Sequence, residues 1–111
     1  MSFFYDQDLE FSAVGPGAKR KIRAYGGRLM MVEFFFEDRE QAQVTPHAHR
    51  HEQVTYCLEG ELELILGDET RLMKAGDSAY IPPNVPHGAV PKSEKARALD
   101  IFTPIREDFL K

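Results

Sequence analysis

The chain has 111 residues, a formal net charge of −4, one cysteine and no tryptophan. This length suits a single domain, residues 1–111, and the balance of 42% hydrophobic to 29% charged residues excludes a disordered or fibrous chain. The acidic charge argues against nucleic acid as a partner. No apolar run is long enough to span a bilayer, the N-terminus lacks a secretory pattern, and Cys57 alone forms no internal disulfide. We therefore expect a cytoplasmic protein with neither a nucleic-acid nor a membrane partner.

The N-terminal part of the chain carries an aromatic segment and a basic cluster. The aromatic segment 3–11 is expected to cover one end of the fold or a neighbouring copy of the chain. The basic residues are interpreted as a solvated loop and the start of a strand, with steering of anionic ligands as the alternative. They are Lys19, Arg20, Lys21 and Arg23.

Glycine and proline recur at short intervals along the chain, which interrupts helices and favours many short strands. The pair Gly67–Asp68 predicts the turn of a β-hairpin. Only the tail, 104–111, has the composition of a helical turn. Many short antiparallel strands predict an all-β sandwich or barrel. The expected strands are, in chain order, 28–37, 53–60, 61–67, 69–76, 78–83 and 96–102.

All four histidines lie between positions 47 and 87. His47 and His49 are two residues apart, so on an extended strand their side chains point the same way. Gln53 has the same parity, and His87 follows three prolines that stiffen the backbone before it. Neutral imidazole is a common ligand of transition metals. We expect a divalent ion, Ni, Zn, Mn or Fe, held by three histidines and a glutamine.

Two further side chains near the histidines have alternative interpretations. His51 is either a group at the rim of the metal site or a solvated turn residue. Cys57 is expected to be a small apolar wall residue, because no basic neighbour in sequence lowers the pKa of its thiol.

The expected C-terminal strand contains one carboxylate among apolar residues. Asp100 shares a face with Phe102, and an unpaired carboxylate on an inward face is costly. One interpretation is a structural ion pair with Arg106. The other is a general acid/base facing the metal, with Phe102 shaping a pocket and Arg106 holding a ligand carboxylate.

The histidine region and the segment after it resemble the two motifs of the cupin superfamily. The first, at about 41–60, reads H-x-H-x3-Q-x6-G, and the second, at about 76–91, reads G-x5-P-x-N-x2-H. The resemblance implies a double-stranded β-helix, or jelly-roll barrel, completed by a strand and tail at about 96–111. Gln53 stands where the family usually has glutamate. The metal ligands that it implies are His47, His49, Gln53 and His87.

Four segments resemble the pectin-degradation cupins of KdgF type: GGRLMMVEFFFE, HAHRHEQVTYCLEGELE, AGDSAYIPPNVPHG and LDIFTPIREDFL. This resemblance implies an isomerase that linearises 4,5-unsaturated monouronates, a small anionic sugar substrate. It also implies that the functional C-terminal residues are Asp100, Phe102 and Arg106. The alternatives are a metal-dependent cupin oxygenase and a non-catalytic sugar-binding cupin. A homodimer is expected, because a chain of this size buries only a modest core.

Overall fold

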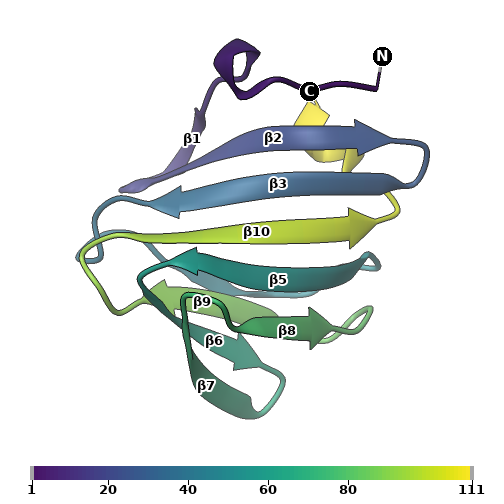
Figure 1. Cartoon of the computed structure of the whole chain (residues 1–111). Coiled ribbons are helices and arrows are strands. Elements are labelled where there is room, and N and C mark those ends of the chain that lie inside the picture. Colours follow the sequence, from purple (N-terminus) through teal and green to yellow (C-terminus); the bar gives the residue numbers. More distant parts are fainter. Residues whose placement is uncertain (1, 111) are drawn as a thin grey trace.

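The computed structural model describes residues 2–110 as two antiparallel sheets (Figure 1). The strands are β1 (Ser12–Gly15), β2 (Ala18–Gly26), β3 (Leu29–Phe36), β4 (Val44–His47), β5 (Glu52–Glu59), β6 (Glu61–Leu66), β7 (Glu69–Lys74), β8 (Ser78–Ile81), β9 (His87–Pro91) and β10 (Ala96–Thr103). Two 3-10 turns, η1 (Asp6–Asp8) and η2 (Glu107–Leu110), lie near the ends. One sheet has the order β1-β2-β3-β10-β5-β8 and the other β4-β9-β6-β7. The all-β prediction is confirmed.

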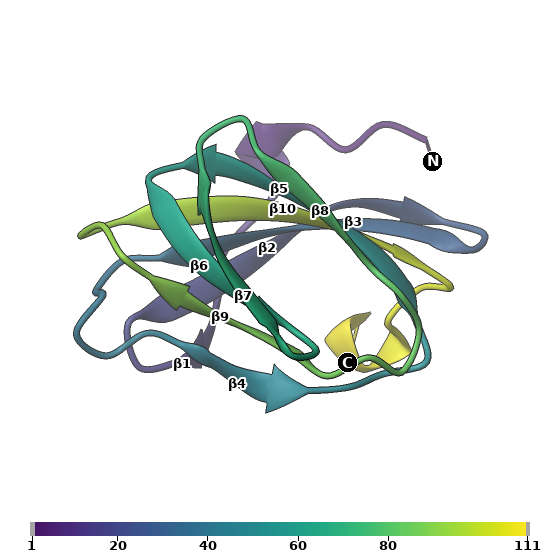
Figure 2. The ribbon, with the colours of Figure 1, turned by 90° about the horizontal axis from the view of Figure 1, so that it is seen from below.

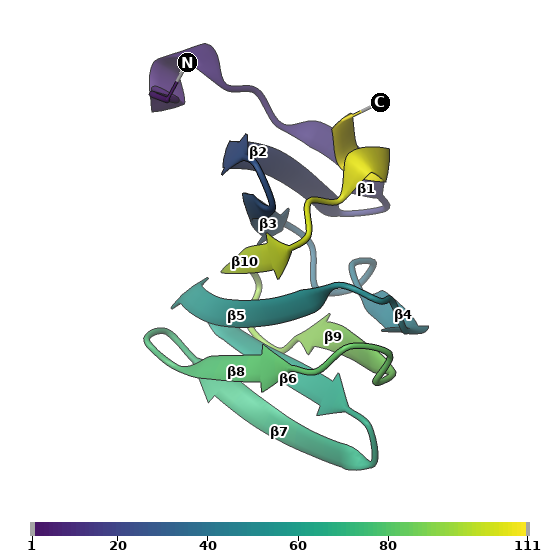
Figure 3. The same cartoon turned by 90° about the vertical axis from the view of Figure 1, so that its right-hand side faces the viewer.

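The two sheets face each other and enclose the core. Figure 2 shows β2, β3, β10 and β5 along one wall, with β4, β9, β6 and β7 along the other, and Figure 3 shows the same two layers from the side. Strand alternation directs apolar side chains inward from both layers. The innermost side chains are Phe102, Met30, Leu62, Ile81, Val32 and Cys57, each less than 2% exposed.

All six expected strands form, as β3, β5, β6, β7, β8 and β10, and the alternation of side chains explains why. On β5 the buried face carries Thr55 and Cys57, while Val54 and Tyr56 on the other face are exposed. The predicted hairpin is β6–β7, whose strands pair from Glu61↔Lys74 to Leu66↔Glu69 around the Gly67–Asp68 turn. The expected helical turn of the tail is η2.

Strand β2 corrects the interpretation of the basic cluster as a solvated loop. The cluster lies within β2, which pairs with β3 from Ala18↔Phe36 to Gly26↔Leu29. Three of its four side chains, Lys19, Lys21 and Arg23, are ion-paired on the outer face of the sheet, so they are not free in solvent. An example is Lys21, only 9% exposed, whose Nζ lies 3.1 Å from Asp6 Oδ1.

The turn between β5 and β6 requires glycine. Gly60 has a φ of +77°, and a Cβ there would collide with the backbone oxygen of Lys95 and with Ser93 Oγ. The β5–β6 turn therefore packs directly against the segment 93–96, where Ala96 is fully buried. Both helices in the described part of the chain are single 3-10 turns, and neither has the length or apolarity needed to cross a membrane.

Candidate metal centre and active site

Three histidines from β4, the segment after it and β9 converge at one end of the fold. His47 ends β4 and His87 begins β9, where the two residues are paired across the strands. His49 lies two residues beyond β4, and its ring centroid is 4.7 Å from that of His87. One donor atom from each ring lies within 4.8 Å of the others, so the cluster is able to hold a metal ion.

Backbone carbonyls fix the tautomer of all three rings. Because a carbonyl oxygen only accepts hydrogen bonds, each Nδ1 carries a proton, and in the neutral ring the lone pair is therefore on Nε2. Burial lowers the pKa of His49 and of His87, which favours the neutral, ligating form. The Nδ1 contacts are His47 with Thr45 O at 3.1 Å, His49 with His51 O at 3.0 Å and His87 with Val85 O at 3.0 Å.

Gln53 adds a fourth donor atom on the inner face of β5. Its Oε1 lies 3.1 Å from His49 Nε2. When His49 is neutral with its proton on Nδ1, both atoms are acceptors, and a cation bound between them would make the contact favourable. Three imidazoles and one amide oxygen form a neutral donor set of the kind that transition metals accept. The residues present therefore fit the expected divalent ion.

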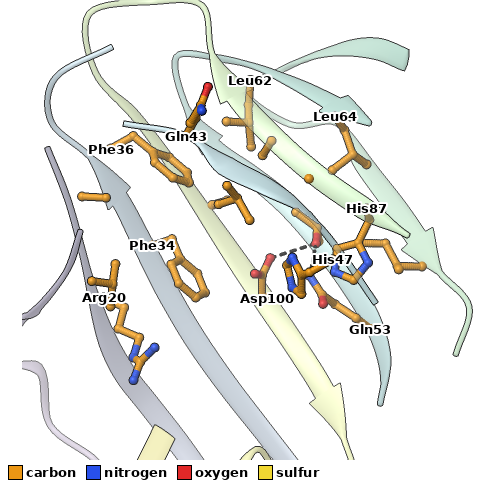
Figure 4. Close-up of a pocket in the computed structure, with 18 of the residues that line it drawn as sticks. Arg20, Phe34, Phe36, Gln43, His47, Gln53, Leu62, Leu64, His87 and Asp100 are labelled. Carbon is orange, nitrogen blue, oxygen red and sulfur yellow. Dashed lines mark hydrogen bonds between the residues drawn. The ribbon is translucent and has the colours of Figure 1, made fainter. Parts of the chain in front are cut away.

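Asp100 is connected to this cluster by a row of hydrogen bonds across β5 and β10 (Figure 4). Gln53 Nε2 donates to Thr55 Oγ1 at 2.8 Å, and Thr55 Oγ1 donates to Asp100 Oδ1 at 2.8 Å. The register supports the row, because Thr55 and Asp100 are directly opposite each other. Burial raises the pKa of Asp100 to about 7, although the hydrogen bonds from Thr55 and Gln53 oppose that rise.

Arg106 does not form the ion pair with Asp100 that one interpretation required. Its Nε and Nη2 instead donate to the two carboxylate oxygens of Asp108, at 3.2 and 3.1 Å. Its guanidinium lies 5.5 Å from the ring centroid of Phe102. Phe102 is 2% exposed and packs edge-on against His49, with ring centroids 5.9 Å apart. Asp100, Phe102 and Arg106 all line one cavity.

His51 is not a solvated turn residue. Its Nε2 lies 3.2 Å from the backbone oxygen of Ile105, beside Arg106, and its Nδ1 is buried with no hydrogen-bond partner among residues 2–110. Since its own carbonyl accepts the Nδ1 proton of His49, His51 joins the histidine cluster to the C-terminal tail.

The cavity has a volume of about 360 Å³ and extends from the histidines between the two sheets. Several of its polar and aromatic residues were not predicted from the sequence to line a site, among them Thr55, Arg20 and Phe109. The parity of Thr55 with Gln53 on a half-buried strand was a usable signal for its inward direction. For Phe109, which follows the last strand, no sequence pattern indicated a packing direction.

Two residues of the second motif hold the loops around the cluster. Asn84 has a φ of +64°, a conformation that asparagine tolerates better than most residues. Its backbone N–H donates to the carbonyl of His49 at 2.7 Å. Gly88 lets β4 approach β9, since a Cβ at this position would lie 2.5 Å from Val44 O. The motif thus sets the separation of His47 and His87.

Residues 34–102 match the Cupin_2 family of cupin domains. The chain is 37% identical to the pectin degradation protein KdgF of Dickeya dadantii over 109 residues, or 97% of each chain. Among solved structures, KdgF from a Halomonas species has 36% identity and a TM-score of 0.90, covering 97% of this chain and 99% of its own. An RmlC-like cupin from Shewanella frigidimarina has 37% identity and a TM-score of 0.89, covering 96% of this chain and 94% of its own.

The two KdgF proteins match nearly the whole chain, and the Cupin_2 match includes both histidine motifs and most of the C-terminal strand. They agree with the two-sheet architecture and with the cluster of His47, His49 and His87 at one end of it. The chain therefore belongs to the cupin superfamily, in which it resembles the KdgF-type pectin degradation proteins.

Proposed function

We propose that this cupin is a metal-dependent isomerase that converts 4,5-unsaturated monouronates from pectin or alginate breakdown into linear 5-keto-4-deoxyuronates. The observation that carries the proposal is the row from Gln53 through Thr55 to Asp100, which brings a carboxyl group into the cavity wall beside the histidine cluster. The similarity to KdgF over almost the whole chain supports the substrate class.

The reaction opens a cyclic hemiacetal whose ring oxygen is bonded to an alkene carbon. The C1 hydroxyl loses its proton, and the C1–O5 bond breaks as C1 becomes an aldehyde. The enolate that this leaves at C5 takes a proton at C4 and becomes a ketone. Substrate and product contain the same atoms in the same overall oxidation state, so the reaction needs only proton transfer and charge stabilisation.

The residues of the cavity supply both needs. Asp100 takes the proton from the C1 hydroxyl and delivers a proton to C4, while Thr55 orients its carboxyl group. Phe102 shapes the wall, and Arg106 stabilises the negative charge of the substrate carboxylate. When bound by the three histidines and Gln53, a divalent ion such as Ni, Zn, Mn or Fe supplies Lewis acidity at the substrate oxygens.

The decisive test follows the alkene absorbance of an unsaturated monouronate mixed with the metal-loaded protein. We expect loss of absorbance faster than spontaneous ring opening. Asp100→Asn should lower turnover by about 10²- to 10⁴-fold, the usual contribution of a positioned acid/base, with unchanged metal content. If the loaded wild-type protein gives no acceleration, the proposed reaction is wrong; if D100N has normal turnover, Asp100 is not its acid/base.

Two alternatives predict other results in the same assay. A metal-dependent oxygenase consumes O₂ and loses its activity under nitrogen, whereas ring opening proceeds equally well without oxygen. A non-catalytic sugar-binding cupin binds a uronate but leaves the absorbance decay at the spontaneous rate. Measurements with and without oxygen, combined with a binding measurement, therefore separate the three functions.

We also infer that the protein forms a homodimer through the outer face of its larger sheet. An apolar row crosses four strands there: Met31, Ile101, Val54 and Tyr80, paired in that order. Val54 and Tyr80 are 42% and 50% exposed. A sheet face of this kind fits a second copy of itself, and burial of the row would extend a small core. The single-domain organisation over residues 1–111 and the cytoplasmic location stay predictions.

A further inference from the structure

The basic cluster of β2 divides between the two faces of the sheet. Three of its four members point to the outer face, and each is ion-paired there. The pairs are Lys19 with Glu37 at 3.4 Å, Lys21 with Asp6 at 3.1 Å, and Arg23 with Asp6 at 2.6 Å and with Glu33 at 3.4 Å. The fourth member, Arg20, points the other way.

Arg20 is a half-buried wall residue of the cavity that His47 and His87 also line (Figure 4). Its register partner on β3 is Phe34, which lines the same cavity. The guanidinium carbon of Arg20 lies 3.8 Å from the ring centroid of Phe109 in η2. Within residues 2–110, no Asp or Glu oxygen lies at ion-pairing distance from Arg20. Stacking on Phe109 therefore orients the side chain without neutralising its charge.

Arg106 differs from Arg20 in this respect. Its Nε and Nη2 both donate to Asp108, so the edge of the guanidinium that best matches a carboxylate is already occupied. Its guanidinium carbon lies 4.3 Å from the ring centroid of Phe109, so both arginines contact the same aromatic ring. The cavity thus contains one arginine with a bound carboxylate and one without.

The electrostatics of Arg20 favour an anionic ligand. The pKa of its guanidinium is lowered, chiefly by burial. The charge of Asp108 opposes this shift, and the charge of the neighbouring Arg106 adds to it. Arginine stays protonated in proteins under such conditions. A cation that is partly desolvated and close to a second cation gains more than a surface cation does from a charge-assisted, two-pronged contact with a carboxylate.

We propose that Arg20 is a substrate-binding residue that determines specificity for anionic sugars by holding the carboxylate of the ligand with its guanidinium inside the cavity. This inference rests on the proposed function for the identity of the substrate. It concerns recognition of the carboxylate and leaves proton transfer to Asp100. Arg106 then contributes positive charge beside the same ligand while it remains bound to Asp108.

The test compares Arg20→Gln and Arg20→Lys with Arg23→Gln, which removes the same charge from the outer face of the same strand. Each metal-loaded protein is titrated calorimetrically with D-galacturonate and with the neutral D-galactose, and KM and kcat are measured with an unsaturated monouronate. We expect R20Q to weaken galacturonate binding and raise KM by about tenfold or more. Galactose affinity and kcat should stay within about twofold of the wild-type values. A contact that binds the ground state and the transition state equally well changes KM and leaves kcat unchanged.

The variants also separate recognition from a structural role. R20K keeps the positive charge but loses the planar guanidinium, so we expect a loss of galacturonate affinity smaller than that of R20Q. If R20Q does not fold, the galacturonate affinity of R20K tests the role of Arg20. The inference is overturned if R20Q and R23Q lose affinity equally, if galactose binding falls as much as galacturonate binding, or if the wild type binds no galacturonate. If R20Q selectively loses galacturonate affinity but neither the wild type nor any variant accelerates ring opening, Arg20 binds the carboxylate and the proposed reaction is wrong.

Discussion

Thr55 makes two hydrogen bonds that connect the candidate metal ligand Gln53 to the acid/base candidate Asp100. It accepts from Gln53 and donates to Asp100, both at 2.8 Å, and is 3% exposed. The direction of these bonds follows from the amide of Gln53, whose oxygen faces His49 and whose nitrogen must therefore face Thr55. A single hydroxyl thus sets the orientation of two functional side chains.

Thr55→Val keeps the shape of the side chain and removes the hydroxyl. Gln53 and Asp100 then each lose a partner in the cavity wall, which should cost about 1–3 kcal/mol of unfolding free energy. Urea unfolding of the metal-free protein measures this loss, and the absorbance assay should show lower turnover. Thr55→Ser retains the hydroxyl and serves as the control. Equal stability and turnover of T55V and T55S would contradict the role given to the hydroxyl.

At the level of elements, the pairing of β4 with β9 decides whether the histidines meet. These strands pair irregularly, with register partners Val44↔Ala89 and His47↔His87. The irregularity coincides with Gly88, where the backbone of β4 passes close enough to exclude a side chain. Because Gly88 has no side chain, β4 and β9 approach each other closely. The imidazoles of His47 and His87 therefore lie side by side at the ends of these strands.

Gly88→Ala should push β4 away from β9. An added Cβ would lie 2.5 Å from Val44 O and 3.0 Å from Pro46 N, both rigid backbone atoms. Overpacking of this kind costs about 1–3 kcal/mol of stability. Displacement of His47 should lower metal affinity by about 10- to 100-fold, the usual effect of disturbing the surroundings of a ligand. Competition with a chromophoric chelator measures the affinity.

The matched control is Gly26→Ala, because a Cβ at Gly26 has no neighbour within 4 Å. G26A should bind metal as the wild type does. If G88A binds metal with wild-type affinity, Gly88 does not set the separation of the two histidines.

At the scale of the whole molecule, the larger sheet has two chemically different outer regions. Near β2 and β3, charged residues are paired with one another, as in the contacts of Glu33 with Arg97 at 2.7 Å and Arg23 at 3.4 Å. Near β5 and β8, the outer face exposes the large side chains of Val54, Tyr56 and Tyr80, with Glu52 at one end hydrogen-bonded by the Tyr80 hydroxyl. The inner face contains the cavity, so the outer face of β5 and β8 is available for association.

Val54→Glu should convert the proposed homodimer into a monomer, since association would bury a carboxylate without a partner. Sedimentation equilibrium at micromolar concentrations measures the mass. Leu72→Glu is the matched control: Leu72 is 48% exposed on β7 of the smaller sheet, and this variant should remain dimeric. A wild-type protein that sediments as a monomer would contradict the interface.

The sequence alone determined the features that depend on local pattern. Alternation of apolar and polar residues predicted β5 and β6, and the Gly67–Asp68 turn predicted the hairpin to β7, because side-chain direction in a strand repeats every second residue. The spacing of the histidine motifs predicted the cluster of His47, His49 and His87, and the apolar surroundings of Asp100 identified it as unusual.

Only the tertiary structure decided the features that depend on which strands lie side by side. Thr55 joins Asp100 because β5 and β10 are neighbours, although the two residues are 45 positions apart in sequence. The division of the basic cluster, with Arg20 inside and Arg23 outside, required the pairing of β2 with β3 and the ion pairs that neutralise the outer side chains. Local pattern sets the direction of a side chain relative to its own strand, but its partners, its burial and hence its chemistry are set by long-range packing.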